Sequence, residues 1–282
     1  MKKICLCVSF TLLLCGCSSL ISKATTGFTK NLMVAVLNQD DPEIVRDGVP
    51  TLLLTLDSLI EGSPENTDLL AAGAKLYASY GALFVTDPVR ASRLTSRARR
   101  YAARAMCKSY EPSCGWPDAT YDDFMASLPA TGSKDAEYLF AYGFASLAYL
   151  RAHSSDWNSL AELPQIEALL VHYLDISGDE VDSSVYTLMG VLLTLRPAAL
   201  GGEPERAREY FERAIADSDG HDLSAKVEFA KGYAKSLYER KLHDQLLNEV
   251  VNADPYQDGF VLSNVLAQEE AAILLAEANE YF

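Results

Sequence analysis

The chain has 282 residues, of which 49% are hydrophobic and 22% charged, and its 24 Lys and Arg stand against 39 Asp and Glu to give a formal net charge of -15. This composition is that of a globular protein, long enough for one elongated or two compact domains. The acidic excess argues against binding to nucleic acid or to an anionic bilayer, because both surfaces carry phosphate groups that would repel it.

The N-terminus has the features of a secretory signal. Lys2 and Lys3 precede an apolar run over residues 4–14, which is too short for a permanent membrane span. We therefore expect a signal peptide over residues 1–16. Four of the six cysteines of the chain, Cys5, Cys7, Cys15 and Cys17, lie in the first seventeen residues, where they belong to export and processing.

The end of this signal, Leu14-Cys15-Gly16-Cys17, resembles a bacterial lipobox, with Cys17 as the lipidated residue and new N-terminus. Several acyl chains would make a durable anchor, since each buried methylene contributes roughly 0.8 kcal/mol. Ser18 follows the cysteine, which under the sorting rule implies the periplasmic side of the outer membrane. Residues 17–30 would then form the lipidated N-terminus and tether. The alternative is a plain signal peptide cleaved nearby.

Start signals for helices recur along the mature chain. Asp41-Pro42, Ser63-Pro64 and Asp87-Pro88 each offer an N-cap followed by proline at the first helical position. Ser133 is expected to cap a helix that is apolar nearly all round and therefore buried. No strand is predicted. The expected helices cover residues 28–37, a segment from 42 onward, 64–85, 90–108, 121–128, 137–151, 165–176, 224–238, 241–252 and 261–281.

The segment from Val185 to Asp219 suggests how these helices are organised. Its second half is amphipathic, and Gly190 and Phe211 fall at positions typical of a tetratricopeptide unit, with a turn near Pro197 and Gly201. A two-helix unit cannot bury its apolar face alone, so neighbouring units must stack on it. We predict an all-α domain over residues 31–282, built from degenerate helix-turn-helix repeats in a right-handed superhelical array. The expected helix-packing positions are Gly73, Gly143, Gly190, Ala207, Phe211, Ala214 and Gly232.

One helix stands apart by its charge. Arg93, Arg97, Arg99, Arg100 and Arg104 make the segment 90–108 the one locally basic element of an acidic chain. We interpret it as a solvated face paired with neighbouring acids. The alternative is a stripe that docks a partner or attracts anions.

Cys107 and Cys114 are candidates for a disulfide, because they close an eight-residue loop and an oxidising periplasm favours the bond. Two free thiols are the alternative. A zinc site is not expected, since no histidine lies near these two thiols.

The sequence offers little catalytic chemistry. The four histidines, His153, His172, His221 and His243, are not spaced as in HExxH, and we interpret each as a surface residue. Gly201-Gly202 lacks the Lys-Ser/Thr that follows in a P-loop. We therefore expect no enzyme, no metal and no cofactor.

Several segments together resemble the TatT lipoproteins associated with TRAP (tripartite ATP-independent periplasmic) transporters. The similar stretches cover Asp156-Trp157 and residues 161–169, 196–215, 226–255 and 264–282, most of the mature chain. Residues 107–117 and 119–135 correspond least.

The resemblance implies a non-enzymatic, all-α periplasmic lipoprotein that partners the solute-binding protein of a TRAP-type uptake system. It also implies self-association, with a trimer expected, and a pore or cavity that could pass a small hydrophobic ligand. A scaffold lipoprotein of an outer-membrane assembly complex is the alternative function.

Overall fold

The computed structural model describes residues 31–178, 181 and 183–282, in which all regular structure is helical. The signal peptide and Cys17 lie outside these described residues. Residues 31–37 form a short first helix, which agrees with the prediction over its described part. The α-helices that follow are α2 Pro42–Gly62, α3 Thr67–Leu83, α4 Pro88–Ser109, α5 Tyr121–Ser127, α6 Ala136–Ala152, α7 Trp157–Leu160, α8 Leu163–Ser177, α9 Ser184–Thr194, α10 Pro204–Asp217, α11 Leu223–Glu228, α12 Arg240–Val251 and α13 Val261–Tyr281.

Shorter helical turns connect several of these helices. A π-helical turn, Phe229–Ala234, continues α11. The 3-10 turns cover Glu111–Asp118, Leu128–Ala130, Ser133–Asp135 and Ala198–Leu200.

Two of the predicted helix starts are confirmed. The Asp41 carboxylate accepts a hydrogen bond from the backbone N–H of Glu43 at 2.9 Å, and α2 begins at Pro42. In the same way, the Asp87 carboxylate accepts from the N–H of Arg90 at 2.7 Å at the start of α4. In both cases an acidic cap satisfies a backbone donor that has no partner inside the helix.

The start predicted at Ser63-Pro64 is wrong. Ser63 ends α2, because its backbone N–H bonds to the carbonyls of Leu59 and Ile60. The next helix, α3, is instead capped by Asn66, whose side-chain oxygen accepts from the N–H of Leu69 at 3.0 Å. The Ser-Pro pair therefore lies in the turn between the two helices.

Ser133 is also not the cap that we predicted. It lies inside a 3-10 turn, in which the backbone N–H of Gly132 donates to the Asp135 carboxylate at 3.1 Å. Asp135 is fully buried and also accepts from the Ser109 hydroxyl, so the carboxylate that organises this turn is held by the end of α4.

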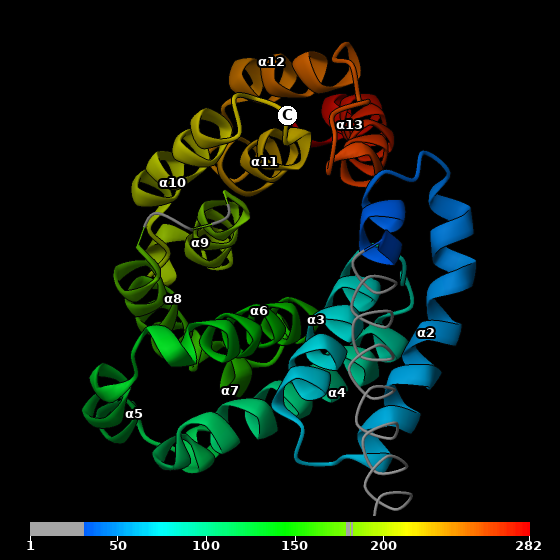
Figure 1. Cartoon of the computed structure of the whole chain (residues 1–282). Helices are drawn as coiled ribbons and strands as arrows, with labels where there is room; N and C mark the ends of the chain where they lie inside the picture. Colours follow the sequence, from blue (N-terminus) through cyan, green and yellow to red (C-terminus); the bar gives the residue numbers. More distant parts are fainter. Residues whose placement is uncertain (1–30, 179–180, 182) are drawn as a thin grey trace, which may run out of the picture.

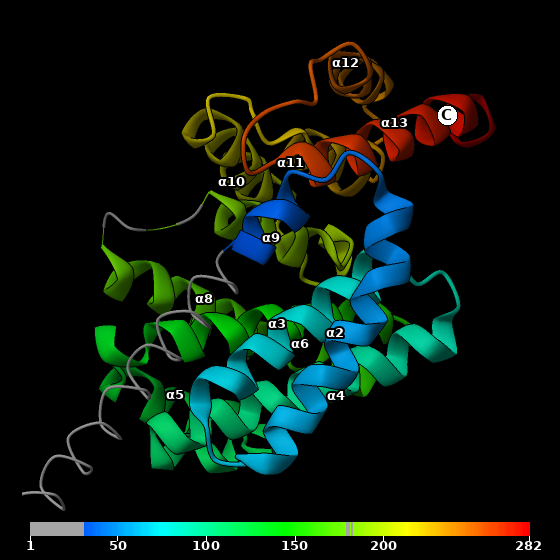
Figure 2. The same cartoon turned by 45° about the vertical axis from the view of Figure 1, so that its right-hand side comes forward.

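Helices that are adjacent in sequence pack against each other, as α3 does with α4, α9 with α10 and α12 with α13. Figure 1 shows that the chain runs from α2 through α3, α4 and α6, rises through α8, α9 and α10, and returns through α11 to α13. The view in Figure 2 again places the end of this path above the start of α2.

Hydrogen bonds join the two ends of this path. The Asn38 amide donates to the Asp258 carboxylate at 2.8 Å, and its oxygen accepts from the backbone N–H of Gly259 at 2.7 Å. Gly259 has a φ of +82°, which a glycine adopts without strain. The array of helices is therefore closed between residues 38 and 259, and α13 also packs against α2.

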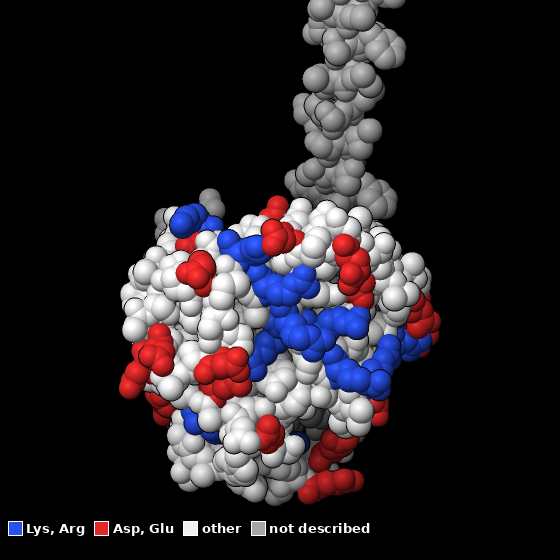
Figure 3. Space-filling view, turned by 90° about the horizontal axis from the view of Figure 1, so that it is seen from below, with Lys and Arg blue, Asp and Glu red and all other residues white. Residues whose placement is uncertain are grey.

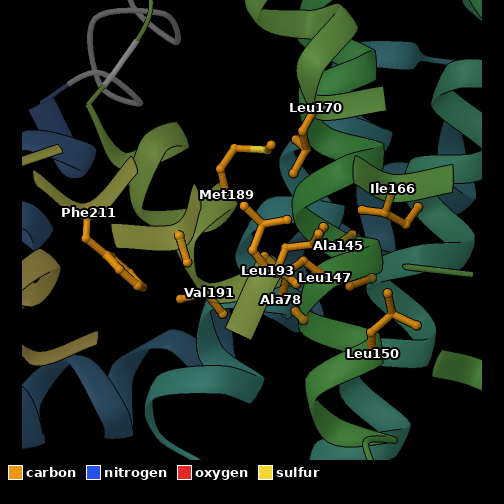
Figure 4. Close-up of a cluster of buried hydrophobic side chains, with 14 of the residues drawn as sticks. Ala78, Ala145, Leu147, Leu150, Ile166, Leu170, Met189, Val191, Leu193 and Phe211 are labelled. Atoms are coloured by element: carbon orange, nitrogen blue, oxygen red, sulfur yellow. The ribbon is translucent and has the colours of Figure 1, made fainter. Parts of the chain in front are cut away.

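A large apolar core extends through most of the array, from Val45 in α2 to Leu274 in α13. Part of it lies between α6, α8 and α9, where the side chains of Leu170 and Met189 point toward each other (Figure 4). The predicted buried helix is α6, in which Leu139 and Leu150 are fully buried. This core fixes the surfaces that the outer helices present to solvent.

Candidate partner-binding surface

Helix α4 has one face of small residues and one face of cations. Its buried side carries Thr95, Ala98, Ala102 and Ala105, which allow close packing on α3 and α6. All 22 of its residues are described, and none of them is acidic. The helix therefore brings positive charge to a fixed place on the surface of an acidic chain.

The exposed cations of α4 form what we call the basic face. On an α-helix they fall within an arc of about 80° and extend for about 27 Å, because each residue turns by about 100° and rises by about 1.5 Å. Figure 3 shows Lys and Arg gathered in one band across this side of the molecule. The residues of the basic face are Arg90, Arg93, Arg97, Arg100, Arg104 and Lys108, all of them exposed.

Carboxylates pair with only part of the basic face. Arg97 lies 2.8 Å from Asp57, and Lys108 lies 2.6 Å from Glu65. Arg93 and Arg100 have no hydrogen bond or ion pair with any described residue. Two carboxylates thus face six cations, so our interpretation of a face paired with neighbouring acids holds for a minority of these residues.

Tyrosine rings lie under three of the guanidinium groups. Arg90 lies over Tyr80 at 5.5 Å from the ring centroid, and Arg97 over Tyr77 at 5.4 Å. Arg104 lies over a third ring at 5.7 Å and donates to the backbone carbonyl of Pro64 at 2.7 Å. Such stacking limits the conformations of arginine side chains before any partner arrives.

The Asp57 carboxylate holds two of these rings in place. It accepts from the hydroxyl of Tyr77 at 2.7 Å and from that of Tyr101, the ring beneath Arg104, at 2.8 Å. Burial and the hydrogen bond to Asp57 raise the pKa of Tyr101 to about 12. Both effects favour the protonated phenol, so this hydroxyl remains a donor at neutral pH.

A disulfide between Cys107 and Cys114 links the last turns of α4 to the loop that follows it, with the two Cα atoms 4.4 Å apart. A surface hollow of about 270 Å³ lies beside it, lined by Pro64, Glu65, Arg104, Cys107 and Lys108. The disulfide therefore fixes the end of the basic face.

Replacing Cys107 with serine should lower the free energy of unfolding by about 2.5 kcal/mol, because an eight-residue loop loses that much closure entropy when it is cross-linked. Urea denaturation of the chain and of the variant, each with and without reductant, would measure the difference. Reductant should destabilise the wild-type chain and leave Cys107→Ser unchanged. Equal midpoints for all four samples would show that the two cysteines are not bonded.

The residues predicted for helix packing lie at crowded contacts. A Cβ atom at Gly190 would be 2.6 Å from the Phe211 ring, and one at Gly143 would be 2.7 Å from Leu170. At Gly73 the nearest atom is 3.0 Å away on Ile60, and at Gly232 it is the Thr194 hydroxyl at 2.6 Å. The three positions on α10, Ala207, Phe211 and Ala214, are buried.

The histidines make separate contacts with different residues. The His153 ring forms a hydrogen bond of 2.7 Å with the Ser92 hydroxyl, and the His172 ring forms one with the Thr131 hydroxyl. His221 is exposed. His243 is 1% exposed and packs against the ring of Phe282, so its interpretation as a surface residue is wrong. No cluster of three or more metal-ligating side chains occurs among the described residues.

Comparison with known proteins identifies the family. The family model described as "TRAP transporter T-component" matches residues 38–282. The chain belongs to this family. It is therefore an accessory component of TRAP-type transport, and this is not a known enzyme family. The resemblance seen in the sequence is confirmed at this level.

An "Uncharacterized protein" of Treponema pallidum (strain Nichols) is 22% identical over 269 residues, covering 86% of this chain and 81% of that protein. The similarity thus covers most of both chains. In the described part of the chain, no helix combines the length and apolarity that crossing a membrane requires.

Proposed function

We propose that this T-component is a non-enzymatic lipoprotein of the outer membrane that faces the periplasm and binds the solute-binding protein of a TRAP-type uptake system. The family match over residues 38–282 carries the proposal, since it supports a role beside a TRAP transporter. The signal sequence and lipobox ending at Cys17 support the compartment and the anchor. Lipid attachment would keep the domain near the membrane while leaving its helical surface free for a soluble partner.

The binding experiment uses the full-length chain, extracted in mild detergent, as bait for the purified TRAP-type solute-binding protein of the same cell. A saturable complex in a pull-down and in sedimentation would support the role in uptake. Recovery of outer-membrane assembly factors from the periplasmic fraction, with no binding of the solute-binding protein, would favour the scaffold function instead.

Substituting Cys17 with serine should abolish lipid attachment and release the protein from membranes, because Cys17 is the expected acylation site. Labelled palmitate incorporation and membrane fractionation would measure the two effects. Cys15→Ser is the matched control, since Cys15 has Leu14 rather than a small residue before it, and this variant should still be acylated. A Cys17→Ser protein that still carries lipid would contradict the proposal.

The helix pairs fit the proposed stack of tetratricopeptide-like repeats, since consecutive helices such as α9 and α10 pack against each other. We extend the proposal to self-association as a trimer, which analytical ultracentrifugation of the detergent-extracted chain would test. A small hydrophobic ligand carried by the complex is the further part of this proposal, and native mass spectrometry of the purified chain would detect it.

A further inference from the structure

We propose that the basic face of α4 is the docking surface for an acidic face of the solute-binding protein. The identity of the partner rests on the proposed function, whereas the place and chemistry of the contact come from the structure. A partner that presents carboxylates to Arg93 and Arg100 would supply counter-charges that no described residue provides.

The distribution of charge favours one orientation of such a partner. Seven of the 24 Lys and Arg of the chain lie in α4, a helix of 22 residues without an acid, while the chain as a whole carries a charge of -15. An acidic surface would be repelled by most of this protein and attracted to the basic face. Long-range charge of this kind speeds the encounter and selects the face that meets the partner.

Several side chains of the basic face are held in place by other residues of the chain before a partner binds. Arg90, Arg97 and Arg104 lie over tyrosine rings, and Arg97 is further held by Asp57. Side chains that are already ordered lose less conformational entropy when a complex forms. The free cations Arg93 and Arg100 lie within this ordered row, so a partner pairing with them meets a largely fixed surface.

Arginine is the residue suited to a protein partner rich in carboxylates. Five of the six cations of the basic face are arginines, whose planar guanidinium groups can bind a carboxylate through two parallel hydrogen bonds. The length of about 27 Å is comparable with the width of a standard interface of about 800 Å² per partner. The surface therefore has the chemistry and the size of a protein contact.

A membrane surface fits this face less well. Helices that lie in a bilayer interface place large apolar side chains beside their cations. In α4, which is described over its whole length, Val89 is the one exposed large hydrophobic residue, at 64% exposure. Contact with lipid headgroups is therefore kept as an outcome to be tested.

The test uses the full-length chain and the purified solute-binding protein, with Kd measured by biolayer interferometry at low and physiological salt. Arg93→Glu with Arg100→Glu should weaken binding by roughly tenfold or more, mainly through slower association, and should reduce its dependence on salt. Neither arginine makes a hydrogen bond or an ion pair with a described residue that the substitution would break. Lys241→Glu, at an exposed lysine on α12 that likewise forms no ion pair with a described residue, is the control for a charge reversal elsewhere. Thermal unfolding would verify the fold, and Arg93→Gln with Arg100→Gln would replace the reversal if that variant did not fold.

The outcomes separate the two proposals. If the wild-type chain does not bind the solute-binding protein at all, the proposed function fails and this inference fails with it. If the wild-type chain binds and the arginine variants bind as tightly as Lys241→Glu, the inference alone is overturned. If the arginine variants lose only binding to phosphatidylglycerol vesicles, or only self-association, the basic face serves a membrane or a second copy, and the inference is likewise overturned.

Discussion

Replacing Phe211 with alanine should lower the free energy of unfolding by about 3–5 kcal/mol, the range for removing a fully buried aromatic ring. Phe211 is 0% exposed and stacks on Phe229 with ring centroids 5.3 Å apart. Its ring also fills the space against Gly190 that a side chain on α9 would otherwise occupy. The residue thus joins α9, α10 and the π-helical turn, and its loss would leave a cavity among all three.

The partner substitution Gly190→Ala should also destabilise, because its Cβ would lie 2.6 Å from the Phe211 ring and overpacking typically costs about 1–3 kcal/mol. In a chain that already carries Phe211→Ala, however, the added methyl group enters the vacated space. The second substitution should then be neutral or stabilise by up to about 1 kcal/mol, the helix preference of alanine over glycine. Chemical denaturation of the four proteins would measure this coupling.

Gly48→Ala is the matched control for this cycle. Gly48 lies inside α2. Apart from the nearby backbone of α2 and its two chain neighbours, no atom lies within 4 Å of a Cβ added there, so alanine at this position should be neutral or slightly stabilising. A Gly190→Ala protein as stable as Gly48→Ala would show that α9 and α10 are not closely packed at this point.

Local signals predicted much of the fold, because helix starts depend on a few adjacent residues. Asp41 and Asp87 cap their helices as expected, since a carboxylate close to unpaired backbone donors is stabilising in any context. Ser63 shows the limit of this reasoning. The same Ser-Pro pattern is compatible with a turn, and Asn66, three residues later, provides the better cap.

Contacts between distant residues could not be predicted in this way. Asn38 meets Asp258 and Gly259 across more than two hundred residues, and nothing in either segment indicates the other. The burial of His243 also depends on a distant residue, Phe282, which covers its ring. Periodicity reports which side of a helix is apolar, but it does not report which helix covers that side.

The basic face also combines features that the local sequence predicts with contacts that it does not. Five arginines of α4 were evident in the sequence, where they identified residues 90–108 as a basic helix. Asp57 was not singled out, because it lies in a largely apolar helix, yet its carboxylate holds both Tyr77 and Tyr101 beneath that surface. Polar residues inside an otherwise apolar helix are the signal that could have indicated this support.

Arg99 is the one arginine of α4 that points inward, and replacing it with alanine should cost about 3 kcal/mol, at the lower end for a broken buried ion pair. Its side chain is 13% exposed and donates two hydrogen bonds to the Glu162 carboxylate, one of them 3.1 Å long. The Glu162 side chain is 26% exposed. The guanidinium also lies over the Tyr149 ring at 4.7 Å. Burial is the largest single influence on the pKa of Arg99 and lowers it, but the hydrogen bond to Glu162 and the further interactions with Glu162 and Tyr142 together outweigh burial, so the pKa is raised.

The cost of Arg99→Ala should come mainly from Glu162, which would be left partly buried without its counter-charge. The double variant Arg99→Met with Glu162→Leu removes both charges and should recover most of the lost stability, because apolar residues of similar size can replace a buried pair. Arg100→Ala is the matched control, since this neighbour is exposed and unpaired among the described residues, and its effect should stay within about 0.5 kcal/mol. Urea denaturation would compare the four proteins. Equal stabilities of Arg99→Ala and Arg100→Ala would mean that the ion pair between α4 and the start of α8 does not stabilise the fold.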